Sequence, residues 1–206
     1  EPVDIRLLRR FAADKEMEML DSGALSLPEE KNPPAGAKKV AVIGAGPAGL
    51  TVADDLAGRG FAVTVYEATP AAGGMLRWGI PDYRLPERIL DHEIELIRRK
   101  GVSFVYNCRV GNDISFEKLR QENDAVFIGA GAQVSRKLGV DGEEKAGVSY
   151  GIEFLSPTST LEKPSEIKGK VIVIGGGNVA VDVARTAKRL GAGAVEMVCL
   201  EQRGEM

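Results

Sequence analysis

Two copies of one pattern constrain the fold of this chain more than any other feature of the sequence. Each copy is a short apolar run, then a glycine-rich turn, then apolar residues at helical spacing. The first begins at Lys39 and turns at residues 44–49, and the second begins at Lys170 and turns at residues 175–180. A strand, a glycine turn and a helix in this order open a Rossmann-type unit, in which parallel strands alternate with helices. The sequence therefore predicts an α/β fold with two Rossmann-like, dinucleotide-binding starts.

The remaining periodicity divides the chain into three parts. Residues 1–36 are predicted to form an N-terminal amphipathic helix, over residues 4–20, and a proline-containing linker. Residues 37–168 are predicted to form the first domain, with further strands over 61–66, 102–106 and 125–128 and helices over 85–100 and 116–121. Residues 169–206 supply only one strand–helix–strand unit of a second domain, so we expect that domain to be truncated.

The first turn has the residue types that a dinucleotide pyrophosphate requires. Gly44 permits a tight turn, Gly46 lets the backbone approach a phosphate, and Gly49 lets the helix pack closely on the strand. The helix begins near Pro47, and its free N–H groups would face the phosphates. Glu67 ends the next predicted strand, where a carboxylate can accept both hydroxyls of an adenosine ribose. The pattern predicts dinucleotide binding, with a solvated strand-end charge as the alternative for Glu67.

The second turn is the GxGxxA variant of the same motif, and Asn178 occupies the position beside the phosphates. A tight turn without a ligand is the alternative. Glu201 stands at the end of the strand that follows. A carboxylate there would repel a 2′-phosphate, which favours NADH over NADPH. Arg203 lies close enough in sequence to weaken this inference.

Composition excludes several classes of partner and site. The net charge is −3 and no basic block alternates with aromatic residues, so we expect neither nucleic acid nor an anionic membrane surface as a partner. No apolar run approaches the roughly 20 residues of a membrane helix, and the charged start is not a secretory signal, so we expect a cytoplasmic protein. The two cysteines, Cys108 and Cys199, are too few for an iron–sulfur or zinc site, and no metal ligands are predicted.

Several longer segments, in a fixed order, are more specific than either turn alone. They run nearly the length of the chain and include Gly44–Gly49, Gly73–Leu76, Gly79–Pro86, Asp124–Gly131 and Gly175–Asp182. In these segments the chain resembles the small (beta) subunit of glutamate synthase, and the flavin arm of dihydropyrimidine dehydrogenase is similar. The resemblance implies a Rossmann-like flavoprotein that binds two dinucleotides, in which an FAD domain is followed by the first part of an inserted NAD(P)-binding domain.

The resemblance also implies an activity and a set of binding residues. Hydride would pass from NAD(P)H to FAD, and the flavin would pass electrons to iron–sulfur clusters. The residues at matching FAD positions, together with the third glycine of the turn, are Gly44, Ala45, Gly46, Pro47, Ala48, Gly49, Glu67, Gly74, Met75, Arg84 on the flavin side and Val110 on the adenine side. The residues that match the nicotinamide-nucleotide loop are Gly176, Gly177, Asn178 and Val179, to which the turn motif adds Gly175 and the strand end adds Glu201. No general acid or base is assigned, because the flavin performs the redox step.

Three departures from the resemblance shape the expected partners. The cysteine-rich cluster domain that precedes such segments does not occur in the sequence, so an iron–sulfur domain or subunit is expected upstream or in trans, with a larger catalytic subunit. The returning C-terminal part of the FAD domain is also missing, so the fragment itself is expected to be inactive. NADPH-using members have basic residues where this chain has Leu200 and Glu201.

Two other functions remain open from the sequence. One is a non-catalytic nucleotide-binding adaptor subunit, whose N-terminal helix docks a partner. The other is a dehydrogenase with one cofactor and one organic substrate, which the second glycine turn and the lack of a convincing acid–base pair disfavour. A thioredoxin-reductase-like enzyme is excluded because the chain has no paired cysteines.

Overall fold

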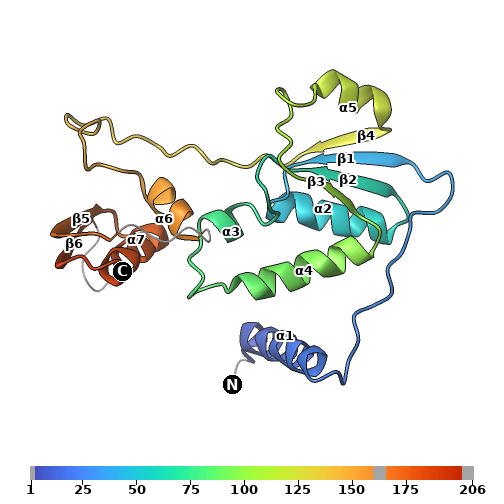
Figure 1. The fold of residues 1–206 in the computed structure, drawn as a ribbon, viewed down its shortest axis with the longest axis horizontal. Coiled ribbons are helices and arrows are strands. Elements are labelled where there is room, and N and C mark those ends of the chain that lie inside the picture. The colour runs from blue at the N-terminus through green and yellow to red at the C-terminus, as the bar shows by residue number, and fades with distance from the viewer. Residues whose placement is uncertain (1–2, 160–165, 201–206) are drawn as a thin grey trace.

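The computed structural model describes residues 3–159 and 166–200 and confirms the predicted α/β class. Figure 1 shows two units side by side, a larger one around a four-stranded sheet and a smaller one around a two-stranded sheet. An extended segment joins them, between strand β4 (Ala125–Ile128) and helix α6 (Gly151–Ser159). Both sheets are parallel throughout.

The four-stranded sheet has the order β3-β2-β1-β4. Strand β1 (Lys39–Ile43) lies between β2 (Ala62–Tyr66) and β4, and β3 (Ser103–Val105) is at the edge. Val42 of β1 is in register with Val65 of β2 and with Phe127 of β4, and both valines are fully buried. A continuous apolar strand is expected at the centre of a parallel sheet, because helices cover both of its faces.

Three helices pack around this sheet. Helix α2 (Pro47–Gly58) and helix α4 (Glu87–Arg99) lie together on one side, and α5 (Phe116–Glu122) lies on the other, beside β4 (Figure 1). The core joins apolar side chains of β1, β2 and α2: Val40, Val42, Leu50, Ala53, Val63 and Val65. Leu119 of α5 is also fully buried. This packing fixes the turn between β1 and α2 at the carboxyl end of the sheet.

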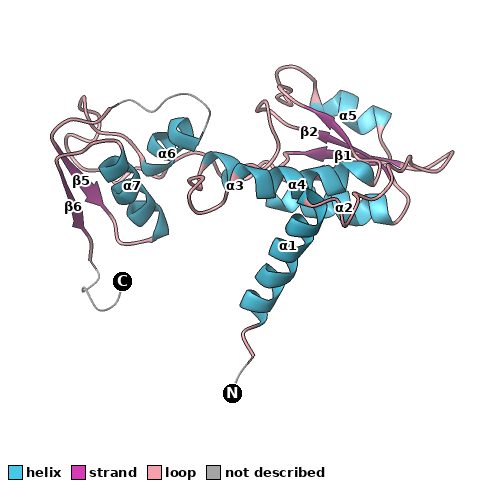
Figure 2. Cartoon of the chain, turned by 60° about the horizontal axis from the view of Figure 1, so that its bottom comes forward, coloured by secondary structure: helices cyan, strands magenta, loops and turns pink. Residues whose placement is uncertain are grey.

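The second unit consists of β5 (Lys170–Ile174), β6 (Ala194–Val198), α7 (Asn178–Arg189) and α6. Helix α7 covers one side of the two strands (Figure 2), where Ala180 and Ala187 are buried. Apolar side chains that are more than half exposed remain on both strands, at Ile172, Ile174 and Val198. Helix α6 was not predicted and packs against α7. The domain boundary predicted at residue 168 stays a prediction.

Helix α1 (Ile5–Asp21) forms where the amphipathic pattern predicts a helix, and the side chain of Asp4 accepts a hydrogen bond from the Leu7 N–H at its start. The helix projects from the body of the protein (Figure 2) and contains no buried residue. Phe11 and the other apolar residues of its first half are exposed, so within the described residues nothing covers that face. No helix in the described part of the chain is long and apolar enough to cross a bilayer.

Candidate functional site

The first glycine turn has the geometry of an anion site. Gly44 has a φ of 96°, in the region that favours glycine, and its N–H donates to the Tyr66 carbonyl at 2.8 Å. Gly46 is the N-cap of α2 and Pro47 is its first residue. No side chain caps this helix. Its first N–H groups and the positive end of its dipole are therefore available to a phosphate.

Two other backbone segments converge on this turn. A Cβ atom on Gly74 would lie 2.7 Å from the Cα of Gly46, and a Cβ on Gly44 would lie 2.5 Å from the Gly129 carbonyl oxygen. The segments enclose a cavity of about 150 Å³. Seven residues predicted from the sequence line it: Gly44, Gly46, Pro47, Ala48, Glu67, Gly74 and Met75. Four more, which the sequence analysis did not assign, come from the end of β4: Gly129, Ala130, Gly131 and Gln133.

Glu67 is buried, lines this cavity and is held at both carboxylate oxygens. Its Oε2 accepts from the Ala45 N–H at 2.7 Å, and its Oε1 accepts from the Thr69 N–H at 2.8 Å. The Thr69 hydroxyl has one hydrogen and two acceptors in reach, Glu67 Oε1 at 2.8 Å and the Ala71 carbonyl at 2.9 Å. A carboxylate has about four acceptor positions. One or two therefore remain for the hydroxyls of a ribose.

The single tryptophan completes this network. Trp78 Nε1 donates to Thr69 Oγ1 at 3.2 Å, from the end of the short helix α3 (Met75–Trp78). Neither Thr69 nor Trp78 was predicted as a site residue, because no spacing rule links them to Glu67. The structure brings together the cavity's carboxylate, a hydroxyl and an indole in one chain of hydrogen bonds.

The second glycine turn repeats the geometry of the first. Gly175 has a φ of 131°, and its N–H donates to the Val198 carbonyl at 2.8 Å. Gly177 is the N-cap of α7, again without a side-chain cap. Gly177, Asn178 and Val179 are exposed, and Gly176 is half-buried. The turn is thus open to a ligand, whereas Glu201, predicted to select the nucleotide, lies outside the described residues.

Four of the predicted FAD residues do not line the first cavity. Ala45 and Gly49 are buried within its glycine turn, whereas Arg84 and Val110 lie elsewhere. Arg84 Nη1 lies 2.7 Å from Oδ2 of Asp182, a buried carboxylate of α7, so the structure pairs it with the second unit. Val110 forms an isolated bridge with Ile114 and does not line the cavity. Asp182 was not assigned from sequence, since a pair 98 residues apart leaves no local signal.

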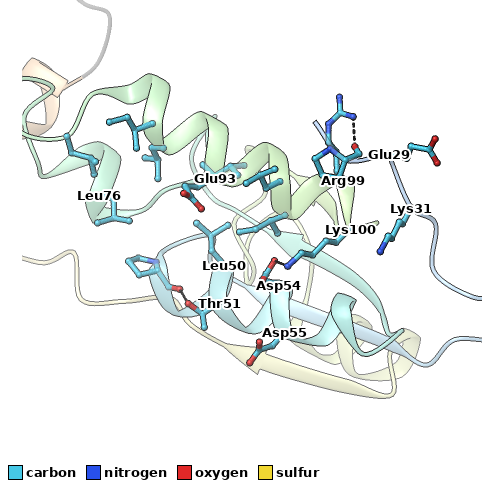
Figure 3. Close-up of a pocket in the computed structure, with 18 residues that line it drawn as sticks. Glu29, Lys31, Leu50, Thr51, Asp54, Asp55, Leu76, Glu93, Arg99 and Lys100 are labelled. Atoms are coloured by element: carbon cyan, nitrogen blue, oxygen red, sulfur yellow. Dashed lines mark hydrogen bonds and ion pairs between the residues drawn. The ribbon is translucent and has the colours of Figure 1, made fainter. Parts of the chain in front are cut away.

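A larger hollow of about 620 Å³ lies between α2 and α4, and it shares only Pro47 with the glycine-turn cavity. Figure 3 shows apolar side chains along it, with the Lys100–Asp54 ion pair towards one end. That ion pair is already satisfied at 2.6 Å. The hollow reaches a glycine turn only at Pro47, so we place the candidate site at the two glycine turns themselves, where the uncapped starts of α2 and α7 can bind phosphate. Among the described residues no group of three or more His, Cys, Asp or Glu could hold a metal ion.

The sequence profile of one protein family, described as pyridine nucleotide-disulphide oxidoreductase, matches residues 38–205. The chain belongs to this family. The match covers both glycine turns and therefore supports a fold that binds a flavin and a nicotinamide nucleotide.

Similar proteins from several bacteria extend this result. The chain is 44% identical to the NADP(+)-dependent formate dehydrogenase subunit beta of Moorella thermoacetica, over 100% of this chain and 32% of that protein. It is 39% identical to the NAD-dependent dihydropyrimidine dehydrogenase subunit PreT of Escherichia coli, over 99% of this chain and 48% of that protein. It is also 39% identical to a putative glutamate synthase [NADPH] small chain of Cereibacter sphaeroides, over 82% of this chain and 43% of that protein. The resemblance seen in the sequence is confirmed, and the chain spans less than half the length of these relatives.

Solved structures agree on the fold. FprA of Mycobacterium tuberculosis in complex with NADPH is 24% identical, with a TM-score of 0.67 over 78% of this chain and 43% of that chain. At this identity the likeness shows the fold alone. The Rossmann-like class predicted from the sequence is confirmed.

Proposed function

We propose that this chain is the dinucleotide-binding part of an NAD(P)H-dependent flavin oxidoreductase of the glutamate synthase small-subunit type. FAD would bind at the first glycine turn and a nicotinamide nucleotide at the second. One observation carries the proposal: the same strand–turn–helix geometry occurs twice, and neither helix start is capped by a side chain. Two free helix N-termini in one chain suit two pyrophosphates.

The first site fits FAD by its shape and its donors. Gly46 faces the cavity, and a Cβ added there would meet only the Cα of Gly74, at 3.9 Å. The backbone N–H groups of α2 would hold the pyrophosphate, and the remaining acceptor positions of Glu67 would hold the ribose. Bound FAD would accept the two electrons of a hydride and release them onward. Gly44, Ala45, Ala48, Gly49 and Met75 would shape the same site, with Arg84 and Val110 towards the two ends of the cofactor.

The second site would bind the nicotinamide nucleotide through Gly175, Gly176, Gly177, Asn178 and Val179. We propose NADH as the preferred reductant, because Glu201 would repel a 2′-phosphate. Three relatives are named with NADP(+), NAD and NADPH respectively, so the two reductants have to be compared directly. We also propose a cytoplasmic location, because both reductants are produced there. Cell fractionation checks this location.

The electrons would leave the flavin for iron–sulfur clusters in another domain or subunit. This part of the proposal rests on the resemblance and on relatives that are named as subunits. The described residues contain no cluster of metal-ligand side chains, so the acceptor would lie outside them. A larger catalytic partner would then use the electrons on a substrate of its own.

The visible absorption spectrum of the purified full-length protein tests the proposal. We expect two flavin bands that bleach on anaerobic addition of NADH, faster than on addition of NADPH. Equal or faster bleaching by NADPH would contradict the role of Glu201 and leave the reductase intact. A protein without flavin, even after FAD is supplied, would overturn the reductase and favour a nucleotide-binding adaptor.

Two matched variants separate the two sites. Gly46→Ala and Gly177→Ala each add one methyl group at a helix N-cap whose φ an alanine can adopt, −78° and −76° respectively. Neither methyl meets protein atoms closer than 3.9 Å, so both variants should fold. We expect Gly46→Ala to lose flavin, and Gly177→Ala to keep flavin but resist bleaching by NADH. Loss of flavin in Gly177→Ala would contradict the assignment of one nucleotide to each turn.

A further inference from the structure

The segment between α3 and α4 forms a rigid turn that points towards the second unit. Pro81 and Pro86 fix its two ends, since each proline restricts φ. Inside it, the Arg84 N–H donates to the Pro81 carbonyl at 2.8 Å, and the Glu87 N–H donates to Asp82 Oδ1 at 3.0 Å. The turn therefore presents Tyr83 and Arg84 in one direction with little freedom.

Tyr83 meets one face of α7. The guanidinium carbon of Arg189 lies 3.7 Å from the centroid of the Tyr83 ring, and that of Arg185 lies 4.9 Å from it. Both distances are within the range of cation–π attraction. The Tyr83 hydroxyl is 3.5 Å from the Asp182 carbonyl, and Asp182 also holds Arg84. Residues 182, 185 and 189 are three, four and seven positions apart, so they share one face of the helix.

The charges in this contact between Tyr83 and α7 compensate one another. Arg185 and Arg189 lie one turn apart on α7, where two like charges repel each other. The π face of Tyr83 attracts both of them, and Arg84 neutralises the buried carboxylate of Asp182 below them. Five charged or aromatic side chains from the two units, Tyr83, Arg84, Asp182, Arg185 and Arg189, thus satisfy one another.

The contact also connects the two glycine turns by short, stiff paths. On one side, Tyr83 follows α3, and α3 begins at Met75, which lines the first cavity. On the other side, Arg185 and Arg189 belong to the helix that begins at the second turn. Figure 1 shows α3 between the sheet of the first unit and helices α6 and α7 of the second. A change in the position of Tyr83 would therefore change the placement of one turn relative to the other.

We propose that Tyr83 is a positioning residue, whose ring, held by Arg185 and Arg189, sets the orientation of the nicotinamide-nucleotide unit relative to the flavin unit. The inference rests on the proposed function in assigning the two nucleotides. In this proposal Tyr83 contacts neither the nicotinamide nor the flavin. It acts through α7, and its removal should slow hydride transfer without weakening the binding of either nucleotide.

Anaerobic stopped-flow reduction of the full-length protein by saturating NADH tests this role. Tyr83→Leu should lower the limiting rate of flavin bleaching about tenfold or more, because a misplacement of about 1 Å in the reacting geometry can cost up to 100-fold. Flavin content and the Kd for NAD⁺ should stay within about twofold of wild type. Tyr83→Phe keeps the ring and should restore the rate to within about twofold of wild type.

Arginine variants supply a matched control for charge. Arg189→Gln should slow bleaching in the same way as Tyr83→Leu, whereas Arg120→Gln, an exposed arginine of α5 on the far side of the molecule, should not. A wild-type rate in Tyr83→Leu would overturn the proposal. So would an equally slow Tyr83→Phe, or a parallel loss of NAD⁺ affinity in Tyr83→Leu, because either would show that the ring does not act by positioning.

A distance measurement keeps this test separate from the proposed function. Spin labels would be attached at Lys118→Cys in α5 and Lys168→Cys before β5, both exposed, with Cys108 and Cys199 replaced by serine. Wild type and Tyr83→Phe should give one narrow distance distribution, and Tyr83→Leu a broad one. An unchanged distribution in Tyr83→Leu would overturn the positioning role. A wild-type protein without flavin would end the reductase proposal, while the distance distribution would still decide whether Tyr83 sets the placement of the units.

Discussion

Replacement of Gly49 by alanine should destabilise the protein by an amount that its surroundings define. A Cβ on Gly49 would lie 1.9 Å from the Gly44 carbonyl oxygen, 3.1 Å from the Gly44 carbonyl carbon and 3.2 Å from a methyl group of Val42. The first two atoms are backbone at the end of β1, so no side-chain rotation relieves the overlap. Ordinary contact begins near 3.5 Å. Helix α2 would therefore have to retreat from β1 by about 1.5 Å.

The expected cost is at or above the upper end of the range for overpacked cores, about 3 kcal/mol. For a protein of this size, 1 kcal/mol shifts Tm by about 2–4 °C, so Gly49→Ala should lower Tm by roughly 6–12 °C. Urea unfolding at equilibrium, followed by circular dichroism, gives the free energy directly. Gly58→Ala, at the other end of the same helix, is the control. Its Cβ would have nothing within 4 Å, and alanine should raise helix stability by up to about 1 kcal/mol.

A Gly49→Ala protein within about 0.5 kcal/mol of wild type, with an unchanged dependence on urea, would refute this reasoning. The second turn shows that an alanine can occupy the position equivalent to Gly49. Its third position is Ala180, whose methyl group is accommodated, and a Cβ added to Gly175 would reach it only at 3.4 Å. To accommodate Gly49→Ala without loss of stability, the first turn would have to adopt the wider strand–helix spacing of the second turn.

Two further predictions concern side chains around the first unit. Thr69→Val removes the hydroxyl between Trp78 and the carboxylate of Glu67 and should weaken FAD binding up to about tenfold, the value of one lost hydrogen bond. Thr69→Ser keeps a hydroxyl and should restore the affinity. Titration with FAD measures both variants, and an unchanged affinity in Thr69→Val would show that this network does not orient Glu67. Hydrogen bonds from Arg98, and more weakly from Arg99, lower the pKa of Glu95 from its ordinary 4.5 to about 2, so the ionised carboxylate stabilises the fold above pH 4.5 and this contribution is lost as pH falls towards 2. Glu95→Gln should therefore lose less stability than wild type as the pH falls across that interval. The difference in the free energy of unfolding should be at most about 1 kcal/mol, because solvent screens a partly exposed pair. Urea titrations at several pH values measure it, and equal acid sensitivity of the two proteins would contradict the effect.

The regular elements were predictable because each has a strong local signal. Strand β1 has the bounds that its apolar run predicts, and α4 begins two residues later and ends one residue earlier than its periodicity indicates. Two helices were missed. Helix α3 is four residues long, follows two glycines and is too short for periodicity to detect. Helix α6 contains Gly151 at its start and depends on packing against α7, a tertiary contact that propensity does not encode.

The candidate site was predictable to the extent that its residues are close in sequence. The turn at 44–49 and the carboxylate of Glu67 were found because a motif with fixed spacing describes them. Gly129 follows a predicted strand but opens no helix, so no motif accounts for it. Its role follows from strand order: β4 pairs with β1, which brings the Gly129 carbonyl against Gly44. Similarly, the partner of Arg84 is decided by how two units pack, and this information lies outside any local pattern.

The glycines of the two turns have different physical reasons, and the difference bears on function. In the first turn Gly44 and Gly49 lie against other backbone, so the protein's own packing excludes larger residues there with or without a ligand. Gly177 is different, because its φ of −76° suits any residue and a Cβ would meet nothing within 4 Å. Serine, threonine, aspartate or asparagine would cap α7 as well or better. Neither backbone conformation nor packing within the described residues requires glycine at residue 177, which supports our proposal that a phosphate approaches the backbone closely there.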